Sequence, residues 1–440
     1  MATAAISQIG ISGLKASQAG SLLVSENVAG QNVEGFHRRR LDVTTAKYVG
    51  EGPRSLGGAW TTEGFSREWS RMLDQQRFQA AGTLRYHEAM SAGLRVIDGE
   101  MADPMLSLDG GVNRLFEAVA ALSRNPADAA AEATVVSEAR LLASAILHVD
   151  DRLLEIGAAA SEIVSDRVLQ VNESVQELAA INAAIRRASD TNGASPALLD
   201  RRDALLMQVA EAVGGDIGVS EDGQARVYLG GVPLVEKDLV GHLVWRAGDS
   251  PTLLAEYPSI NGVPGQTLVP VTGSLGGDIR AQIELTTVRD RLISKLPAAF
   301  QGLLERVREA AGQGPGRPGE AVLAYLTGGA AGDTAQTSAD LVRQLASLKP
   351  AEQRQQQGVF LNPWRSLVSA VGVEARSQRT SFEAAQAVDR RLDAEWQSRS
   401  AVNLDEEAAN LMRYQQSYAA SSRVIQVYGQ MLDEVLGMLR

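Results

Sequence analysis

The histidines and the charged clusters of the chain are the places where its side chains could do chemistry. Of the four histidines, His37, His87 and His242 have no carboxylate or second histidine at metal-ligand spacing. His148 and Asp151 lie three residues apart and would share one face of a helix, which supplies two ligands at most. A surface histidine beside an ion-paired aspartate is the better interpretation, and the sequence predicts no metal site.

Two further segments resemble binding sites. Residues 274–277, Ser-Leu-Gly-Gly, precede a predicted helix as a phosphate-binding loop would, but the Walker lysine–hydroxyl pair and the G-x-G-x-x-G motif are absent. A strand-to-helix turn is the better interpretation. In Asp200-Arg201-Arg202-Asp203, the arginines and aspartates of one helical turn are expected to pair with one another in a structural network. Because no nucleophile, base and oxyanion donor come together, we predict no catalytic residue, no cofactor and no enzyme.

The composition restricts the partners of the chain. A net charge of −11 opposes general binding to nucleic acid or anionic membranes, so we interpret the basic run His37-Arg38-Arg39-Arg40 as a solvated or inter-subunit face. The absence of cysteine excludes disulfides and zinc–thiolate sites. No positive charge precedes Lys15 and no apolar run is long enough to cross a bilayer, so we expect neither a Sec signal nor a membrane segment.

Residues 403–440 carry the sequence pattern on which the predicted architecture depends. Asn403 can cap a helix, and Glu406 three residues later completes a capping box. Beyond it, apolar and small residues recur at steps of four and three over about five heptads. The predicted assembly seam comprises Leu404, Leu411, Tyr418, Ile425, Leu432, Leu436 and Leu439. Because the seam continues to the last residues, we expect it to need a partner helix.

Residues 3–30 lack proline and can supply that partner. Ile6, Ile9, Leu14 and Leu23 carry the apolar positions of the seam, and the glycines between them let two backbones approach closely. Each glycine costs about 1 kcal/mol against alanine inside a helix. Such helices are marginal alone, because most helical stability comes from packing. We therefore hypothesise that both ends are poorly ordered in the free monomer and form a helical pair when many copies assemble.

The middle of the chain predicts long helices around a small β insert. Apolar residues at steps of three and four predict a helix from about residue 131 to 188, and Ser195-Pro196 begins a second that ends at Gly214-Gly215. Helix returns at residues 278–311 with a kink near Pro297, and Asn362-Pro363 opens another long helix. Between them, period-two segments and glycine turns predict hairpins.

We therefore predict a mainly α fold that is elongated and nested, with both chain ends at the same end of the molecule. It has paired terminal coiled-coil helices, a long-helix bundle and a small β-rich insert. The predicted domains are residues 1–36 with 403–440, residues 37–215 with 278–402, and residues 216–277.

Short motifs at both ends resemble those of bacterial flagellar axial proteins. They are residues 11–18 (ISGLKASQ) and 27–29 (NVA) at one end and residues 415–420 (QQSYAA) at the other. Within this group, residues 403–411 (NLDEEAANL), 198–206 (LLDRRDALL) and 273–277 (GSLGG) resemble the flagellar hook-associated protein 1 (FlgK) family. Residues 32–36 depart from the family's Asn-Thr-x-Gly-Tyr, since they keep the glycine and an aromatic residue but lose the threonine. The chain is also short for the family, so we expect a reduced outer domain.

The resemblance implies a structural junction protein of the bacterial flagellum that joins the hook to the filament. Its terminal helices would self-assemble into a ring or tube outside the cell after type III export without a Sec signal. The implied partners are further copies of the chain, the hook protein and a second junction protein towards the filament, with no nucleic acid and no membrane. A cytoplasmic export chaperone is also implied, and its candidate binding residues are Leu411, Tyr418, Ile425, Leu432 and Leu436.

Other functions stay open at this point. Another flagellar axial protein, hook or distal rod, would share the terminal motifs, but the acidic run at residues 405–407 and the scarcity of β structure disfavour it. A cytoplasmic coiled-coil scaffold would explain the heptads and not the motifs at both ends. An enzyme carried by the β insert would need a pocket flanked by titratable groups.

Overall fold

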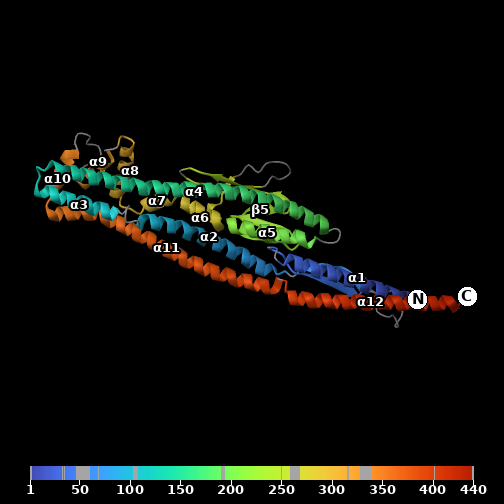
Figure 1. Ribbon diagram of the computed structural model, residues 1–440. Helices are drawn as coiled ribbons and strands as arrows, with labels where there is room; N and C mark the ends of the chain where they lie inside the picture. Colours follow the sequence, from blue (N-terminus) through green and yellow to red (C-terminus); the bar gives the residue numbers. More distant parts are fainter. Residues whose placement is uncertain are drawn as a thin grey trace.

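The computed structural model of the protein describes a long molecule with its two ends together. The described residues are 2–31, 33, 35–45, 60–67, 69–102, 108–189, 194–248, 250–257, 268–314, 317–327, 338–400 and 402–438. The terminal helices α1 (Ala2–Gly30) and α12 (Leu404–Met438) project from one end of a helical body, and both chain termini lie there (Figure 1). The mainly α, elongated and nested fold predicted from the sequence is confirmed.

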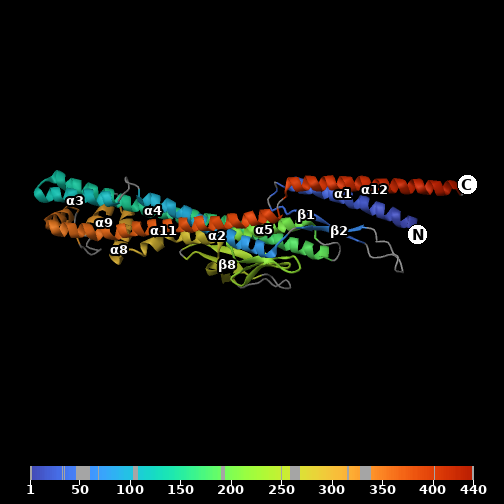
Figure 2. The same ribbon diagram turned by 90° about the horizontal axis from the view of Figure 1, so that it is seen from below.

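Long helices give the body its length. The helix α4 (Ala129–Ser189) runs along it, with α2 (Arg71–Ala102) and α3 (Leu108–Arg124) beside it. The helix α11 (Pro350–Ser400) lies along α2 in both views and leads directly into α12 (Figures 1 and 2). The helix predicted near residues 131–188 is therefore confirmed.

The helix α5 (Pro196–Val213) shows how local signals set the ends of an element. Ser195 caps it, because its hydroxyl accepts from the backbone N–H of Leu198, and proline occupies the first turn. Gly214 and Gly215 end it with φ angles of 63° and 89°, a left-handed conformation that glycine adopts without penalty. Both predicted boundaries of this helix are confirmed.

The β structure consists of three small antiparallel sheets. The strands β1 (Arg39–Thr45) and β2 (Trp60–Arg67) form a ribbon next to α1. The predicted insert holds the other two sheets: β3 (Asp216–Val219), β4 (Ala225–Leu229), β5 (Val232–Glu236) and β6 (Leu239–Val240) form one, and β7 (His242–Arg246), β8 (Thr252–Glu256) and β9 (Leu268–Pro270) form the other. Gly230 and Gly231, at φ 59° and 82°, make the two-residue turn of the β4–β5 hairpin.

Two predicted helices have different boundaries in the structure. The segment predicted as one kinked helix is three helices: α6 (Gly277–Thr286), α7 (Val288–Ile293) and α8 (Ala298–Ala311). Pro297 precedes α8 in an extended conformation. Proline disfavours helical geometry at the residue before it and lacks the N–H that a helix interior needs, so the helical segment is interrupted here. The prediction of a kink was wrong.

The helix α11 also begins at a different residue from the one predicted. The helix begins at Pro350 and passes through Pro363, so the predicted start at Asn362-Pro363 was wrong. The Glu352 carboxylate accepts from the N–H of Lys349 and caps the true start. An interior proline costs about 3 kcal/mol. The buried side chains of Phe360, Trp364 and Leu367 offset it, since each contributes about 1.5–3 kcal/mol.

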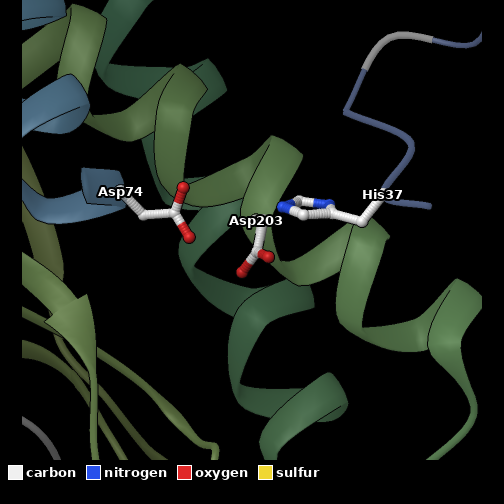
Figure 3. A group of neighbouring side chains, drawn as sticks. All are labelled: His37, Asp74 and Asp203. Carbon is white, nitrogen blue, oxygen red and sulfur yellow. The ribbon is translucent and has the colours of Figure 1, made fainter. Parts of the chain in front are cut away.

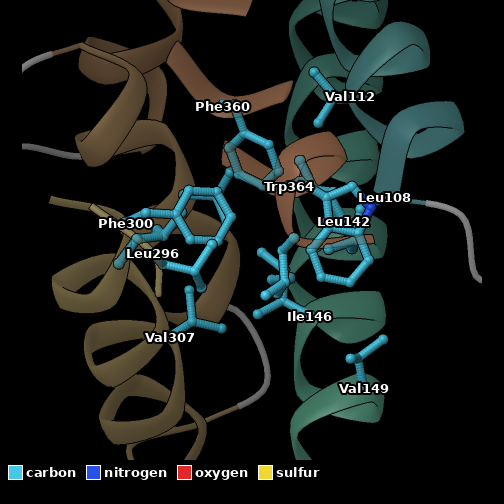
Figure 4. Close-up of a cluster of buried hydrophobic side chains, with 14 of the residues drawn as sticks. Leu108, Val112, Leu142, Ile146, Val149, Leu296, Phe300, Val307, Phe360 and Trp364 are labelled. Atoms are coloured by element: carbon cyan, nitrogen blue, oxygen red, sulfur yellow. The ribbon is translucent and has the colours of Figure 1, made fainter. Parts of the chain in front are cut away.

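Two hydrophobic cores hold the body together. The distal core, away from the chain termini, joins α3 and α4 to α8, α11, α9 (Arg317–Leu326) and α10 (Ser338–Ser347). In Figure 4, side chains of α3 and α4 face those of α8 and α11, and the rings of Phe300 and Phe360 lie 5.0 Å apart. The insert core joins the second half of α4 and α5 to strands β3–β8. The predicted division between bundle and insert stays a prediction, because helices and strands share this second core.

Neither core contains a residue of α1 or α12 among the described residues. Across the same residues, no helix combines the length and the hydrophobicity that a membrane-spanning segment requires. The terminal helices are therefore attached to the body by contacts outside these two cores.

Candidate assembly interface

The terminal helices α1 and α12 pack against each other as an antiparallel pair, called the terminal pair below. Its register is visible in the glycines of α1: a Cβ added at Gly10, Gly13 or Gly20 would lie 2.9, 2.6 and 2.4 Å from Ile425, Ser421 and Tyr414. The α12 partner number falls as the α1 number rises, which makes the helices antiparallel. The glycines therefore permit the close backbone approach that the sequence predicted.

The structure brings together some of the predicted seam residues. Leu23 is buried, and Leu14, Leu411 and Ile425 are half-buried within the terminal pair. Four others keep a large exposed fraction: Ile9 38%, Leu404 47%, Tyr418 40% and Leu432 38%. The side chains of Ile6 and Leu436, and all of Leu439, lie outside the described residues. On each terminal helix, some seam residues therefore face the partner helix and others face solvent.

Large apolar side chains stand exposed along the outer faces of the terminal pair. They are Ile9, Ile11, Leu22 and Val28 on α1 and Leu404, Met412, Tyr418, Val424, Val427, Met431 and Leu432 on α12. Exposed apolar residues also occur on the body, but there they are spread over a much larger surface. A concentration of this kind on two helices marks an interaction surface.

Asn27 ties the end of α1 to the start of β1. Its side chain is fully buried, and it donates to the carbonyl oxygen of Arg39 at 3.1 Å and accepts from the Arg39 N–H at 3.0 Å. The Arg39 guanidinium also pairs with Glu26 at 2.7 Å. These bonds fix the direction in which α1 leaves the body.

Arg38 ties the start of α12 to the same place. Its guanidinium pairs with Glu406 at 2.7 Å and with Glu407 at 2.9 Å, and Glu407 is almost completely buried. Burial alone lowers the pKa of Arg38, but the two carboxylates outweigh it and raise that pKa. Asn403 caps α12 as predicted, since its oxygen accepts from the N–H of Asp405 at 3.0 Å. Glu406 was predicted to complete the box but bonds Arg38 instead.

A cluster of buried charges lies where the terminal pair meets the body, and we call it the polar hub. It comprises His37, Arg67, Asp74, Asp200, Arg202 and Asp203. Asp200 accepts from Arg67 at 3.0 Å and from His37 at 3.2 Å. Burial alone raises the pKa of Asp200, but these two bonds outweigh it and hold the pKa below its ordinary value.

The hub corrects two predictions from the sequence. Within the segment 200–203, Arg202 pairs with its neighbour Asp203 at 2.7 Å. Arg201 pairs instead with Glu177, and Asp200 pairs with Arg67 and His37, so the expected pairing inside the segment holds for only one of the two aspartates. The network is structural as predicted, but its partners come from α2, α4 and the β1–β2 ribbon. The interpretation of residues 37–40 as a solvated or inter-subunit face was also wrong. His37 is buried, and Arg38 and Arg39 are ion-paired within the chain, because acidic residues distant in sequence surround them.

The remaining candidate residues lie apart from the hub. His148 is exposed on α4. The nearby carboxylate that forms ion pairs is Asp150, which pairs with Arg289 and with Arg308, both at 2.6 Å. His87 bonds Gln378 at 2.9 Å. Residues 272–274 form a short 3-10 helix between β9 and α6, which confirms the strand-to-helix turn.

Sequence reasoning missed the polar hub. Its members come from four separate stretches of the chain, so no spacing motif connects them all. A burial signal was also lacking, because charged residues are expected at the surface. The aromatic residues nearby are the one clue: Trp396 of α11 packs edge-on against His37 at 5.3 Å, and Arg77 lies 4.4 Å from the centre of the same Trp396 ring.

Comparison with known families gives two matches. The model of the flagellar hook-associated protein FlgK helical domain matches residues 94–321, which is more than half of the chain. The model of the C-terminal region of the flagellar basal body rod FlgEFG proteins matches residues 396–438, which include α12. The first matched region therefore runs from the end of α2 into α9 and includes the insert, and the second includes one helix of the terminal pair.

Individual relatives carry the same name. The flagellar hook-associated protein 1 of Salmonella typhimurium is 27% identical over 278 residues, covering 61% of this chain and 50% of the relative. The chain thus spans about half the length of that relative. The proteins of the same name from Escherichia coli and Bacillus subtilis are each 22% identical, and the alignments cover 97% and 96% of this chain and 98% and 96% of those relatives.

One solved structure aligns with part of the chain. The flagellar hook junction protein FlgK from Burkholderia pseudomallei aligns with a TM-score of 0.46 at 22% identity, covering 55% of this chain and 43% of that chain.

Proposed function

The chain belongs to the flagellar hook-associated protein FlgK family, and from this premise we propose that it is a junction protein that joins the hook to the filament. The family consists of structural components of the flagellum and not of enzymes. The observation that carries the proposal is the terminal pair, which projects from the body and exposes apolar side chains along its outer faces.

Self-assembly follows from what those side chains gain on burial. Covering an exposed valine, leucine or methionine contributes about 1 kcal/mol or more, and association must offset about 4–15 kcal/mol of lost freedom. A single exposed residue cannot do this, but two adjacent helices with such residues along their whole length can. Further copies of the chain present the same surface, so a ring or tube with the terminal pairs as its inner layer satisfies every subunit alike.

The partners of this layer follow from its position. We propose the hook protein on one side and a second junction protein on the side towards the filament. The β insert lies on one side of the body and far from α12, so it would face outward (Figure 2). We also propose export through the flagellar type III apparatus without a Sec signal.

The accessible face of α12 suits an export chaperone. Tyr418 and Leu432 are exposed already, whereas Leu411 and Ile425 are half-buried against α1. A chaperone that binds all four needs α1 to be displaced. This requirement agrees with the hypothesis that the terminal pair forms only on assembly, because α1 carries helix-weakening glycines.

Another axial protein, such as a rod protein, is the second candidate. The match of residues 396–438 to the rod protein C-terminal model favours it. That region is only the terminal helix and the end of α11, however, whereas the helical domain match covers residues 94–321 of the body. The junction function accounts for both regions.

Two variants test the proposal. Val427→Asp places a charge on the exposed face of α12, and Val388→Asp places the same charge on the exposed face of α11 as its control; these valines are 48% and 54% exposed. We expect both to fold, because neither side chain belongs to a core. Only Val427→Asp should abolish concentration-dependent self-association in sedimentation velocity and fail to restore filaments in a bacterium lacking its own FlgK-family protein.

A deletion supplies the broader test. Removal of residues 404–440 should leave a soluble, folded body and abolish both assembly and chaperone binding. Filaments that still attach to hooks in the presence of the truncated protein would contradict the proposal. In the full-length monomer, strong amide protection of residues 5–30 and 405–435 would contradict the assembly-dependent pairing and leave the junction role standing.

A further inference from the structure

Three side chains of the polar hub converge on one buried point. His37 follows α1, Asp74 lies in the first turn of α2 and Asp203 lies on α5, and Figure 3 shows all three turned towards one another. One nitrogen or oxygen atom from each lies within 4.8 Å of the other two. Their exposed fractions are 2%, 5% and 7%. Solvent therefore does little to screen these groups from one another.

The hydrogen bonds of His37 fix which ring nitrogen carries a proton. Nδ1 lies 3.0 Å from the carbonyl oxygen of Gly35 and 3.2 Å from a carboxylate oxygen of Asp200, and both neighbours are acceptors. Nδ1 must therefore donate; the nearest donor, Arg67, is more distant at 3.5 Å. A neutral imidazole protonated at Nδ1 has a bare lone pair at Nε2.

The atoms that face the centre of this group lack partners of their own. Nε2 of His37 and Oδ2 of Asp74 are buried without a hydrogen bond to any described residue. Electron-pair donors turned towards one another in a buried place repel unless a proton or a metal ion lies between them.

We propose that Nε2 of His37 and the carboxylates of Asp74 and Asp203 bind a divalent transition-metal ion of the Zn²⁺ class. One imidazole and two carboxylates suit Zn²⁺ or Co²⁺, whereas Ca²⁺ and Mg²⁺ prefer oxygen ligands alone. Three protein ligands leave a coordination position for a fourth.

The surroundings of the ligands match those of metal sites. A histidine that binds a metal donates its other N–H to a carboxylate or a backbone carbonyl, and His37 has both acceptors. Asp203 is oriented by Arg67 at 2.6 Å and by Arg202 at 2.7 Å. The second-neighbour groups therefore hold two of the three ligands in place before any ion binds.

The ion would fasten the terminal pair to the body. Residue 37 adjoins Arg38, whose guanidinium holds Glu407 at the start of α12. Asp74 and Asp203 belong to α2 and α5 of the body. A single ion thus connects the segment that anchors both terminal helices to two helices of the body, and its role is structural.

Cobalt titration of the full-length protein tests the site. After removal of metal by a chelator, we expect one Co²⁺ per chain, seen as visible absorption bands of low-symmetry cobalt and displaced by Zn²⁺. Asp74→Asn keeps the shape of the side chain, and no ion pair holds Asp74 within the described part of the chain. This variant should bind at least tenfold more weakly, with an unchanged circular dichroism spectrum. His37→Gln should bind more weakly too.

The control addresses metal bound at the surface. Asp151→Asn removes an exposed carboxylate beside His148, and it should bind Co²⁺ as the unaltered protein does. Zn²⁺ should also raise the melting temperature of the unaltered protein and not that of Asp74→Asn. Absence of stoichiometric Co²⁺ binding, or equal binding by Asp74→Asn, would overturn the proposal.

Discussion

The glycine in the middle of α4 offers a test of how the body is packed. Gly157 interrupts an otherwise apolar face of a 61-residue helix, and from sequence it is the weak point of that helix. In the structure it lies against the end of α6. A Cβ at this position would be 2.8 Å from the carbonyl oxygen of Thr286 and 3.5 Å from its carbonyl carbon. Both atoms are backbone, so neither can rotate away.

Two effects of Gly157→Ala oppose each other. Alanine favours the helix by about 1 kcal/mol over glycine. The added methyl group forces α6 away from α4, and overpacking of this kind costs about 1–3 kcal/mol. We expect the clash to win, with a net loss of about 1 kcal/mol in the free energy of unfolding.

Gly358→Ala is the matched control. Gly358 lies inside the long helix α11, and only the amide nitrogen of Asn362, at 3.6 Å, comes within 4 Å of an added Cβ. Here alanine brings the helix propensity without the clash, so the variant should gain about 0.5–1 kcal/mol. The two variants should then differ by about 2 kcal/mol, or about 2 °C in melting temperature for a chain of 440 residues.

Differential scanning calorimetry of both variants beside the unaltered protein gives the measurement. Gly157→Ala should melt below the unaltered protein and Gly358→Ala above it. If Gly157→Ala is stabilised as much as Gly358→Ala, then α4 and α6 do not approach as closely as described, and glycine at 157 has no packing role.

Two further predictions concern charges in the body. Asp150→Asn should lower the free energy of unfolding by about 2 kcal/mol in urea titrations, because Arg289 and Arg308 lose their shared partner; the figure is kept low because Arg308 is 44% exposed. Burial and the charge of Asp393 raise the pKa of Asp389 in the folded chain, so its ionised form is unfavourable there and stability should rise as pH falls through that folded pKa. Asp389→Asn should therefore gain a few tenths of a kcal/mol at pH 7 and lose this advantage at acidic pH.

Much of the fold follows from local patterns, and particular residues show where such patterns end. Ser195, Pro196 and Gly214 set the ends of α5 without help from distant residues, so that helix was predictable. The start of α11 was not, because Asn362-Pro363 is a good local start that the burial of Phe360 and Trp364 overrides. Local signals fail where tertiary packing supplies more free energy than they do.

Some features of the candidate interface could be predicted from the sequence and others could not. The terminal pair was predictable, since heptad spacing marks α12 and small residues mark α1. Which seam residues face solvent was not: Tyr418 and Ile425 are equivalent in the heptad, yet the antiparallel register turns Ile425 towards Gly10 and leaves Tyr418 40% exposed. Of the polar hub, only the segment at residues 200–203 stood out in the sequence, because the contacts of Asp200 with His37 and Arg67 join residues more than 100 positions apart.

The attachment of the terminal pair bears on the layered assembly proposed above. Both hydrophobic cores lie in the body, and the terminal helices contribute to neither among the described residues. Their attachment rests instead on Asn27, on the pairing of Arg38 with Glu407 and on the polar hub. Charged and hydrogen-bonded contacts are directional, and each can be lost without exposing a core. The angle between terminal pair and body is therefore set by a few polar groups, so a change at the hub should alter assembly geometry before it alters the stability of the body.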